Sequence, residues 1–377
     1  MILKNFPLNL GFLDTPNNPS GIPDRLDFEI EIVDNLLVQK KSSAVQELLN
    51  IAYSSGTFLG TPLSHGDLGR QYALDFLAFL KSCSIKSDSR VLEIGSGTGF
   101  LAHLIAQEGC SVIAVEPGNA KSQYPNSKVE WVNDFFPSPV IEGKFDLICA
   151  YGVLEHIAEA KDFLQELIQY LTPEGKIVFS VPDQSMEILL GDPSGLIHQH
   201  FNYFDANSIR RILDESGLFS NVYKSNYGRC LYSISTLDSS ITDVAPPGGR
   251  NFRVAIGNNE SIYFSYFSRL ENYLNSMRDK ILGFDKPAIW NPSRGIAYLD
   301  PRQEMTFFDD DPDQLEKFLP GFNCPINGFD DFSRSEVGDV IILSRTFAEK
   351  ISHNLQIINF RGNIHTITSL ERELGIG

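Results

Sequence analysis

Residues 91–117 constrain the fold more than any other segment of the chain. They read VLEIGSGTGFLAHLIAQEGCSVIAVEP: a short apolar run, three glycines at alternate positions, a helical pattern and a second apolar run. An apolar run that passes through glycines into a helix and then into a second run is typical of a strand, helix and strand whose strands are parallel. Gly95, Gly97 and Gly99 permit a tight turn with positive φ and let a ligand approach the backbone closely.

An acid ends the second apolar run. Glu116 follows Gly95 by 21 residues, and a carboxylate at this strand end can accept hydrogen bonds from both hydroxyls of a ribose. The segment therefore predicts a ligand that contains adenosine. Read as Gly97-x-Gly99-x-x-Ala102, the turn fits a dinucleotide whose pyrophosphate lies at the helix N-terminus.

The wider pattern predicts an α/β protein. From residue 90 to residue 235, short β-rich apolar runs alternate with helical patterns, which indicates a parallel sheet covered by helices on both faces. A second alternation follows a helical pattern at residues 261–282, and it includes an expected helix at 313–319 and an expected strand at 355–360. Ahead of the core, residues 1–34 are expected to be irregular and residues 31–50 to be helical.

These patterns divide the chain into three parts. We expect an N-terminal arm and helical lid at residues 1–70, a ligand-binding domain at 71–242, and a C-terminal Rossmann-like domain for the acceptor at 243–377. The second boundary falls in TDVAPPGGRN, residues 242–251, because Pro-Pro-Gly-Gly continues neither a helix nor a strand.

The composition favours a small-molecule partner. A formal net charge of −17 at pH 7 disfavours nucleic acid and anionic membrane surfaces, which both need clustered Lys and Arg. No apolar run approaches the roughly 18 residues of a membrane span, and the first residues lack the features of a signal peptide, so we expect a cytoplasmic protein. The five cysteines are far apart, which predicts reduced core residues without a disulfide framework or a zinc site.

Five motifs, in order along the chain, resemble those of class I S-adenosylmethionine-dependent methyltransferases. The first is Glu93-x-Gly95-x-Gly97-x-Gly99. The others are VEP with Glu116 and Pro117, NDFF with Asp134 and Phe135, FDLICAYGVLEHI with Tyr151, and LTPEGKIVFSVP. The resemblance implies S-adenosylmethionine as the cofactor and a seven-stranded, Rossmann-like core that ends in an antiparallel hairpin. A dinucleotide enzyme stays open as the alternative.

The same resemblance implies roles for the motif residues. The glycine loop and Glu93 hold the methionine part of the cofactor, Glu116 and Pro117 lie at the ribose, and Asp134 and Phe135 lie at the adenine. Tyr151 is expected either to line the cofactor pocket or to fill the core. Tyr53 is expected either to close over the cofactor or to serve only as a packing residue.

A second group of polar residues lies in IHQHFNYF, residues 197–204. His198 and His200 are two positions apart, so in extended backbone both project to the same side. A metal site needs a third ligand, and no cysteine or acid stands nearby in sequence, so none is predicted. We expect His200 to be the general base for methyl transfer, with His198 as the second candidate and Tyr203 orienting the acceptor. The alternative is that each only fixes the loop.

This segment is similar to His-Glu-His-x-x-Tyr-Phe of the sugar C-methyltransferases that act on nucleotide-linked keto-deoxysugars. The resemblance implies C-methylation of such a sugar and a C-terminal Rossmann-like domain. Because no cysteine precedes Cys83, we expect this chain to lack the family's cysteine-bound N-terminal zinc module. Because Gln199 and Ile197 replace a glutamate and a tyrosine of that family, two alternatives stay open: O- or N-methylation of a sugar or other specialised metabolite, and cofactor binding without turnover. Asp309, Asp310 and Asp311 follow a predicted strand and either grip ribose hydroxyls or a cation, or cap a helix.

Overall fold

The computed structural model describes residues 1–9, 11–18, 22–54, 63, 66–83, 85–118, 124, 128–239, 260–334 and 336–376. The chain forms two compact units. The core unit consists of Ile32–Ser185 and His200–Asn259, and the C-terminal unit consists of Met1–Glu31, Met186–Gln199 and Glu260–Gly377. The first residues and the segment 186–199 thus belong with the C-terminal unit, which the sequence did not indicate. The boundary expected at residues 242–251 lies outside the described residues.

The described residues of the core unit contain a seven-stranded sheet, with the order β10-β11-β8-β7-β4-β5-β6. Its strands are β4 (Arg90–Ile94), β5 (Ser111–Val115), β6 (Val129–Val132), β7 (Phe145–Tyr151), β8 (Leu171–Pro182), β10 (Phe219–Lys224) and β11 (Cys230–Thr236). Within the sheet, the neighbouring strands β8, β7, β4, β5 and β6 run parallel to one another. Strand β11 is antiparallel to both β8 and β10. The predicted parallel sheet with an antiparallel hairpin is confirmed.

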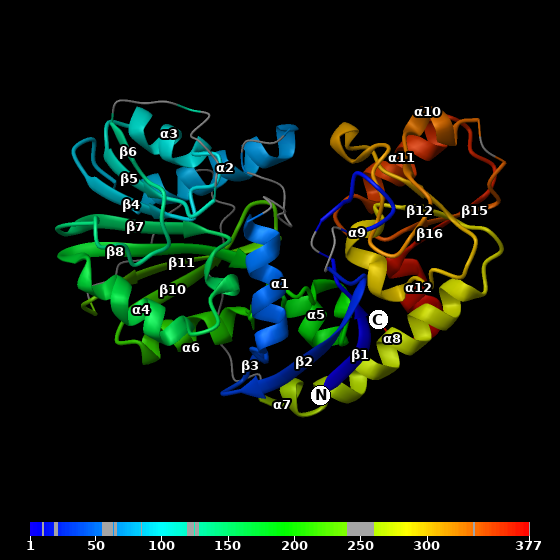
Figure 1. The fold of residues 1–377 in the computed structure, drawn as a ribbon, viewed down its shortest axis with the longest axis horizontal. Helices are drawn as coiled ribbons and strands as arrows, with labels where there is room; N and C mark the ends of the chain where they lie inside the picture. Colours follow the sequence, from blue (N-terminus) through cyan, green and yellow to red (C-terminus); the bar gives the residue numbers. More distant parts are fainter. Residues whose placement is uncertain are drawn as a thin grey trace. The chain divides into compact units, whose positions relative to one another are not determined.

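Helices cover both faces of this sheet (Figure 1). They are α2 (Gly66–Ser82) and α3 (Phe100–Gln107) on one face, and α4 (Ala160–Gln169) and α6 (Ala206–Glu215) on the other. The alternation of side chains along β4 serves both layers: Val91 packs with α2 and α3, whereas Leu92 packs with α4 and α6. Asp205 starts α6 with a capping box in which its side chain accepts from the Ser208 amide.

The N-terminal segment differs from the expectation. It contains β1 (Ile2–Pro7), β2 (Arg25–Val33) and β3 (Leu36–Gln39), and α1 (Ser43–Ser54) begins only after them. β1 is antiparallel to β2, and β3 is antiparallel to β9 (Asn202–Tyr203). Phe28 and Ile30 are buried at alternate positions, which is the period of a strand. Asp34 and Asn35 both adopt positive φ, as in a tight hairpin turn, so the helix expected over residues 31–50 is wrong in its first half.

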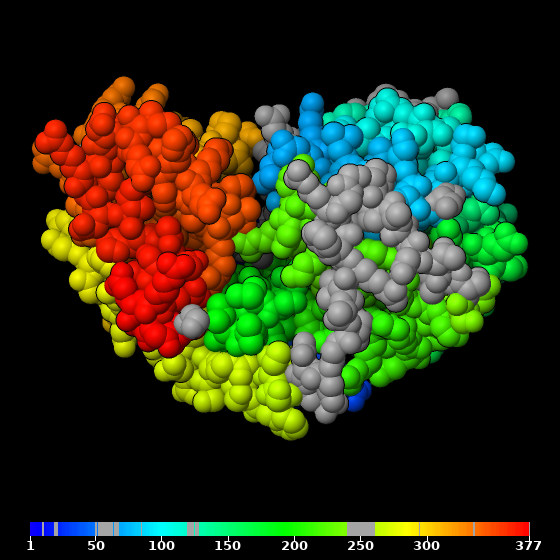
Figure 2. All heavy atoms as spheres, turned by 180° about the vertical axis from the view of Figure 1, so that it is seen from behind, coloured from blue at the N-terminus to red at the C-terminus, as the bar shows by residue number. Residues whose placement is uncertain are grey.

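The described residues of the C-terminal unit contain a second sheet. It has five parallel strands in the order β14-β13-β12-β15-β16. The strands are β12 (Ala288–Trp290), β13 (Thr306–Phe308), β14 (Ile326–Asn327), β15 (Asp339–Ile342) and β16 (Asn363–Thr366). The α-helices of this unit are α5 (Ser185–Leu190), α7 (Glu260–Phe264), α8 (Tyr266–Leu282), α9 (Pro292–Gly295), α10 (Phe329–Phe332), α11 (Ala348–Ile357) and α12 (Ile367–Leu374). The expected Rossmann-like character of this part is confirmed. In the space-filling view, the residues of this unit that are coloured orange and red lie next to one another on the surface (Figure 2).

Two expected elements of this unit are wrong. Residues 313–319 do not form an α-helix: the 3-10 turn η4 (Pro312–Gln314) is followed by Glu316 with a φ of 63°. Residues 355–360 are not a strand, because Ile351 and Leu355 bury one face of α11 against Trp290. The edge strand is β16 instead. No helix in the described part of the chain is long and apolar enough to cross a membrane.

A buried ion-pair network ties the segment 186–199 into the C-terminal unit. Arg345 contacts the Asp192 carboxylate at 2.7 Å and the Glu371 carboxylate at 2.6 Å, and these two side chains are 1% and 4% exposed. Tyr273 donates to Glu371 at 2.8 Å, and Tyr298 donates to Asp192. One guanidinium therefore neutralises two carboxylates that have little access to water.

We predict that Arg345→Met lowers the free energy of unfolding by about 3–5 kcal/mol, because it leaves two buried carboxylates without a cation. The matched control is Arg302→Met, whose guanidinium is 90% exposed beside Asp300, so its loss should change the free energy of unfolding little. Urea unfolding followed by circular dichroism measures both. Equal effects of the two substitutions would contradict the prediction.

Candidate active site

The glycine loop after β4 has the conformation that its sequence predicts. Gly95, Gly97 and Gly99 have φ angles of +71°, +54° and +82°, which residues with a Cβ rarely adopt. A Cβ on Gly95 would lie 2.5 Å from Val153, and one on Gly99 would lie 2.1 Å from Trp131, whereas one on Gly97 meets nothing within 4 Å. Two glycines thus allow close packing within the protein, and Gly97 faces open space that a ligand can enter.

Glu116 lies just beyond β5 and holds this loop. Its carboxylate accepts hydrogen bonds from the Gly97 amide at 2.8 Å and from the Gly118 amide at 2.9 Å. The side chain is half-buried, and the neighbouring Pro117 is exposed. The carboxylate therefore lies at the glycine loop, as predicted, and its role toward a ribose stays a prediction.

Glu93 is buried on the α3 face of β4. Its side chain is 2% exposed, and Oε2 has no hydrogen-bond donor among the described residues. Burial raises the pKa of Glu93 to about 8, and the nearby Glu116 carboxylate adds to the rise. A buried acceptor atom without a donor, next to a glycine loop, suits a ligand that carries a positively charged amino group.

The NDFF segment follows β6 at the same edge of the sheet. Asn133 donates to the backbone oxygens of Glu116 at 3.2 Å and Gly118 at 2.6 Å. Asp134 accepts from the Phe135 amide and from the Ser138 hydroxyl, both at 2.8 Å. The Phe135 side chain is 66% exposed, so its ring is accessible. That Asp134 and Phe135 contact an adenine stays a prediction.

Tyr151 ends β7 and is largely enclosed by protein. Its ring packs edge-on against Phe76, with centroids 5.3 Å apart, and its hydroxyl lies 3.6 Å from the Cys230 sulfur. Burial raises the pKa of the Tyr151 hydroxyl, so it stays protonated at neutral pH. Tyr53 belongs to α1, and its side chain lies outside the described residues.

The two histidines of the HQH segment have different surroundings. His198 belongs to the C-terminal unit and packs against Phe28 and Phe6, with ring centroids 4.8 and 6.2 Å away. Burial lowers its pKa to about 4. His200 belongs to the core unit and packs edge-on against His156, with centroids 4.7 Å apart. The expectation that both rings project to the same side is wrong, because residues 198 and 199 form a turn rather than extended backbone.

The structure also brings together residues that sequence reasoning kept apart. Ligand atoms of Glu155, His156 and His200 all lie within 4.8 Å of one another. Along the chain, His200 has no acidic residue nearby, so its spacing alone predicts no metal site. The available signal was topological, since the LEHI segment follows β7 and the HQH segment comes after the adjacent β8. Tyr203 is 1% exposed and donates its hydroxyl to the His200 backbone oxygen at 3.1 Å, so it positions this residue.

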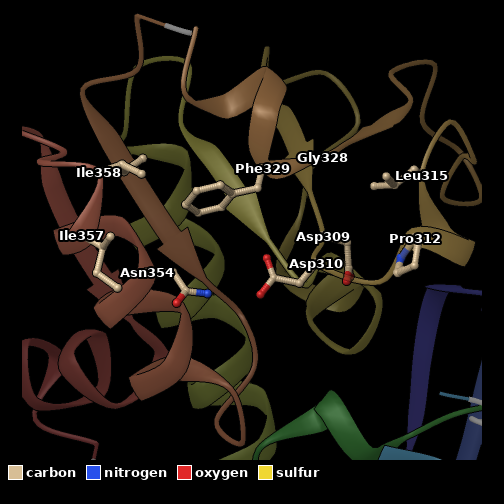
Figure 3. A pocket seen from close by; sticks show the side chains of 9 residues that line it. All are labelled: Asp309, Asp310, Pro312, Leu315, Gly328, Phe329, Asn354, Ile357 and Ile358. Atoms are coloured by element: carbon tan, nitrogen blue, oxygen red, sulfur yellow. The ribbon is translucent and has the colours of Figure 1, made fainter. Parts of the chain in front are cut away.

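The aspartates after β13 have separate roles. Asp311 caps η4 by accepting from the Asp313 amide at 3.0 Å, as the capping alternative predicts. Asp309 accepts from Asn291 at 2.9 Å, and burial raises its pKa. Asp309 and Asp310 face a pocket of ≈ 400 Å³ (Figure 3). Its other lining residues come from η4 and the residue after it, from the two residues after β14, and from α11 and its C-terminal end: Pro312, Leu315, Gly328, Phe329, Asn354, Ile357 and Ile358.

Comparison with known proteins agrees with this geometry. Residues 66–221 match the family model described as a methyltransferase domain. The order of the sheet, with its antiparallel hairpin, is that of the class I enzymes. Residues 66–221 are thus similar to a methyltransferase domain in both sequence and sheet topology. The glycine loop and the buried Glu93 fit S-adenosylmethionine, the cofactor that the sequence predicts.

The curated relatives match about a third of this chain. The mitochondrial ubiquinone biosynthesis O-methyltransferase of Schizosaccharomyces pombe is 26% identical over 124 residues, 30% of this chain and 45% of that protein. C-methyltransferase NovU of Streptomyces niveus is 29% identical over 136 residues, 34% of this chain and 32% of that protein. The match thus spans less than half the length of these relatives.

Among solved structures, that of a Burkholderia thailandensis 1,6-didemethyltoxoflavin-N1-methyltransferase with bound S-adenosylhomocysteine is 17% identical, with a TM-score of 0.39. It covers 56% of this chain and 100% of that chain.

We predict that Gly97→Ala weakens binding of S-adenosylhomocysteine at least about tenfold, a loss of about 1.4 kcal/mol, because a methyl group enters the open side of the loop. The matched control is Gly228→Ala, which has a φ of +69° and equally open surroundings but lies in another turn. Both substitutions cost about 1–2 kcal/mol of stability through the left-handed backbone. Calorimetric titration checks the affinities, and equal affinity in the two variants would refute a ligand at this face.

We also predict that the buried Glu93 makes the protein less stable as the pH rises. The folded protein keeps this proton up to a pKa of about 8, whereas the usual value is 4.5. The free energy of unfolding therefore falls between these two pH values, by an amount on the order of 5 kcal/mol for this group.

Glu93→Gln removes this contribution. From pH 5 to pH 8, the thermal unfolding midpoint of the variant should therefore rise relative to that of the wild type. Glu130→Gln, an exposed acid on β6, should keep the pH dependence of the wild type. A Glu93→Gln variant with the same pH dependence as the wild type would show that Glu93 is ionised in the folded protein.

Proposed function

We propose that the protein is an S-adenosylmethionine-dependent methyltransferase that acts on a small molecule. The observation that carries this proposal is the glycine loop after β4, with Gly97 open to a ligand and Glu116 bound to its backbone, in a sheet of class I order. When bound, S-adenosylmethionine supplies an electrophilic methyl group and leaves as S-adenosylhomocysteine. The glycine loop and Glu93 would bind its methionine part, Glu116 its ribose, and Asp134 and Phe135 its adenine.

His200 is proposed to promote loss of the acceptor's proton. It is 5% exposed, and Tyr203 holds its backbone. The loop after β7, which contacts it through His156, also contains Val153, the residue that packs on Gly95. His200 therefore lies at the edge of the sheet that carries the glycine loop. Histidine is the side chain that most often serves as a general base in catalysis, and His200 acting by itself is proposed for this role.

The acceptor is proposed to be a nucleotide-linked keto-deoxysugar that is methylated on carbon. Supporting this, the C-terminal unit has a pocket at the carboxyl ends of β13 and β14, where open α/β sheets bind ligands. Asp309 and Asp310 line it, and carboxylates at strand ends accept hydrogen bonds from ribose hydroxyls. A relative named as a C-methyltransferase is also among the similar proteins.

O-methylation is the second candidate. A relative named as an O-methyltransferase matches 30% of this chain. Ile197 and Gln199, which are both buried, offer no phenol or carboxylate to help remove a proton from carbon, and a hydroxyl is easier to deprotonate.

The test uses the full chain with methyl-labelled S-adenosylmethionine and a panel of nucleotide-linked keto sugars and hydroxylated metabolites. We expect label to transfer to a keto sugar, and NMR of the product to place the methyl group on carbon or on oxygen. His200→Ala should lower the rate at least about 100-fold, while His198→Phe, at a buried aromatic site, should leave it near that of the wild type. Cofactor binding without transfer to any acceptor would refute the proposed activity.

A further inference from the structure

We propose that Glu155, His156 and His200 bind a divalent transition-metal cation. One carboxylate and two imidazoles offer ligand atoms within 4.8 Å of one another. Glu155 is 3% and His200 is 5% exposed, while His156 is half-buried and gives the cluster access to solvent. A cation 2.0–2.2 Å from each ligand atom requires these atoms to lie about 3 Å apart. Small changes in the side-chain torsion angles would bring them to that separation.

The backbone holds the two ligand segments together. The amide of Phe201 donates to the backbone oxygen of Glu155 at 2.7 Å. The side chain of Asn202 donates to the backbone oxygens of Ile157 at 2.7 Å and Leu154 at 3.3 Å. These bonds join the residues next to His200 to both sides of η1 (Leu154–His156). The three ligands are therefore positioned by contacts that do not depend on the cation itself.

The ligand set indicates which cation would bind. Two imidazoles with one carboxylate favour Zn²⁺, Mn²⁺, Co²⁺ or Fe²⁺ over Mg²⁺ or Ca²⁺, which prefer oxygen ligands alone. Three protein ligands leave further positions open for water or for an oxygen of a second molecule. The positive charge also balances the carboxylate of Glu155 in its buried position.

The place of the cluster suggests its task. Val153 packs on Gly95, and Glu155 and His156 follow two and three residues later. β4 and β7 are neighbours in the sheet, so the cluster lies beside the cofactor loop. This inference rests on the proposed function and specifies it: the cation would hold an oxygen of the acceptor and lower the pKa of the proton to be lost, which then passes to water. His200 would thus act as a cation ligand in place of acting as the base itself.

The experiment measures cation binding directly. The full chain is stripped with a chelator, equilibrated by dialysis with Co²⁺, and analysed for bound metal and for visible absorption from Co²⁺ with nitrogen ligands. We expect about one Co²⁺ per chain. Glu155→Gln, His156→Ala and His200→Ala should each weaken binding at least about tenfold, since even changes that only support a ligand cost about 10–100-fold.

The matched control is His353→Ala, an exposed histidine on α11, which should bind Co²⁺ as the wild type does. Thermal unfolding with S-adenosylhomocysteine shows whether each variant is folded. Because His156 is only half-buried, His156→Ala should disturb folding least. A wild type that binds no Co²⁺, or a folded His156→Ala variant that binds it as tightly as the wild type, would overturn the inference.

Failure of this inference can be told apart from failure of the proposed function. Co²⁺ bound by the cluster without methyl transfer to any acceptor would leave the site standing and refute the activity. Methyl transfer that persists in chelator, with no metal bound, would refute the site and leave the activity standing.

Discussion

The parallel pairing of β4 with β5 on one side and with β7 on the other is the constraint on which the site depends. Parallel neighbours end at the same edge of a sheet, so the loops that follow these three strands must share one small region. Glu116 reaches the amide of Gly97, and Val153 fills the space beside Gly95. A side chain at Gly95 would collide with Val153 in the loop after β7, and one at Gly99 would collide with Trp131 of β6.

Buried carboxylates give this edge of the sheet its electrostatic character. Glu93 and Glu155 are both nearly inaccessible to water, and each lies in a loop or strand end at the site. Burying a negative charge costs free energy unless a proton or a cation neutralises it. The folded protein keeps a proton on Glu93 to a pH well above the usual range. A site of this kind suits partners that bring positive charge, such as the amino group of a methionine or a metal ion.

The path of the chain explains how His200 reaches this edge. After β8 the chain contributes residues 186–199 to the C-terminal unit, where Arg345 binds Asp192, and it returns to the core unit at His200. From there Phe201 bonds to Glu155 and also accepts from the amide of Gln39 in β3. Residues on either side of one peptide bond thus serve different units, which is why His198 and His200 have such different surroundings.

The sequence by itself determined the core fold and the cofactor loop, because both depend on local patterns: apolar periodicity, glycines at residues 95, 97 and 99, and an acid at residue 116. It also contained the signal for the N-terminal hairpin, the Asp34-Asn35 pair, which the helical spacing of nearby leucines obscured. Only the tertiary structure decided the separation of His198 from His200 and the meeting of His200 with Glu155 and His156. These residues are 44 or more positions apart from their partners, so strand order, and not spacing along the chain, brings them together.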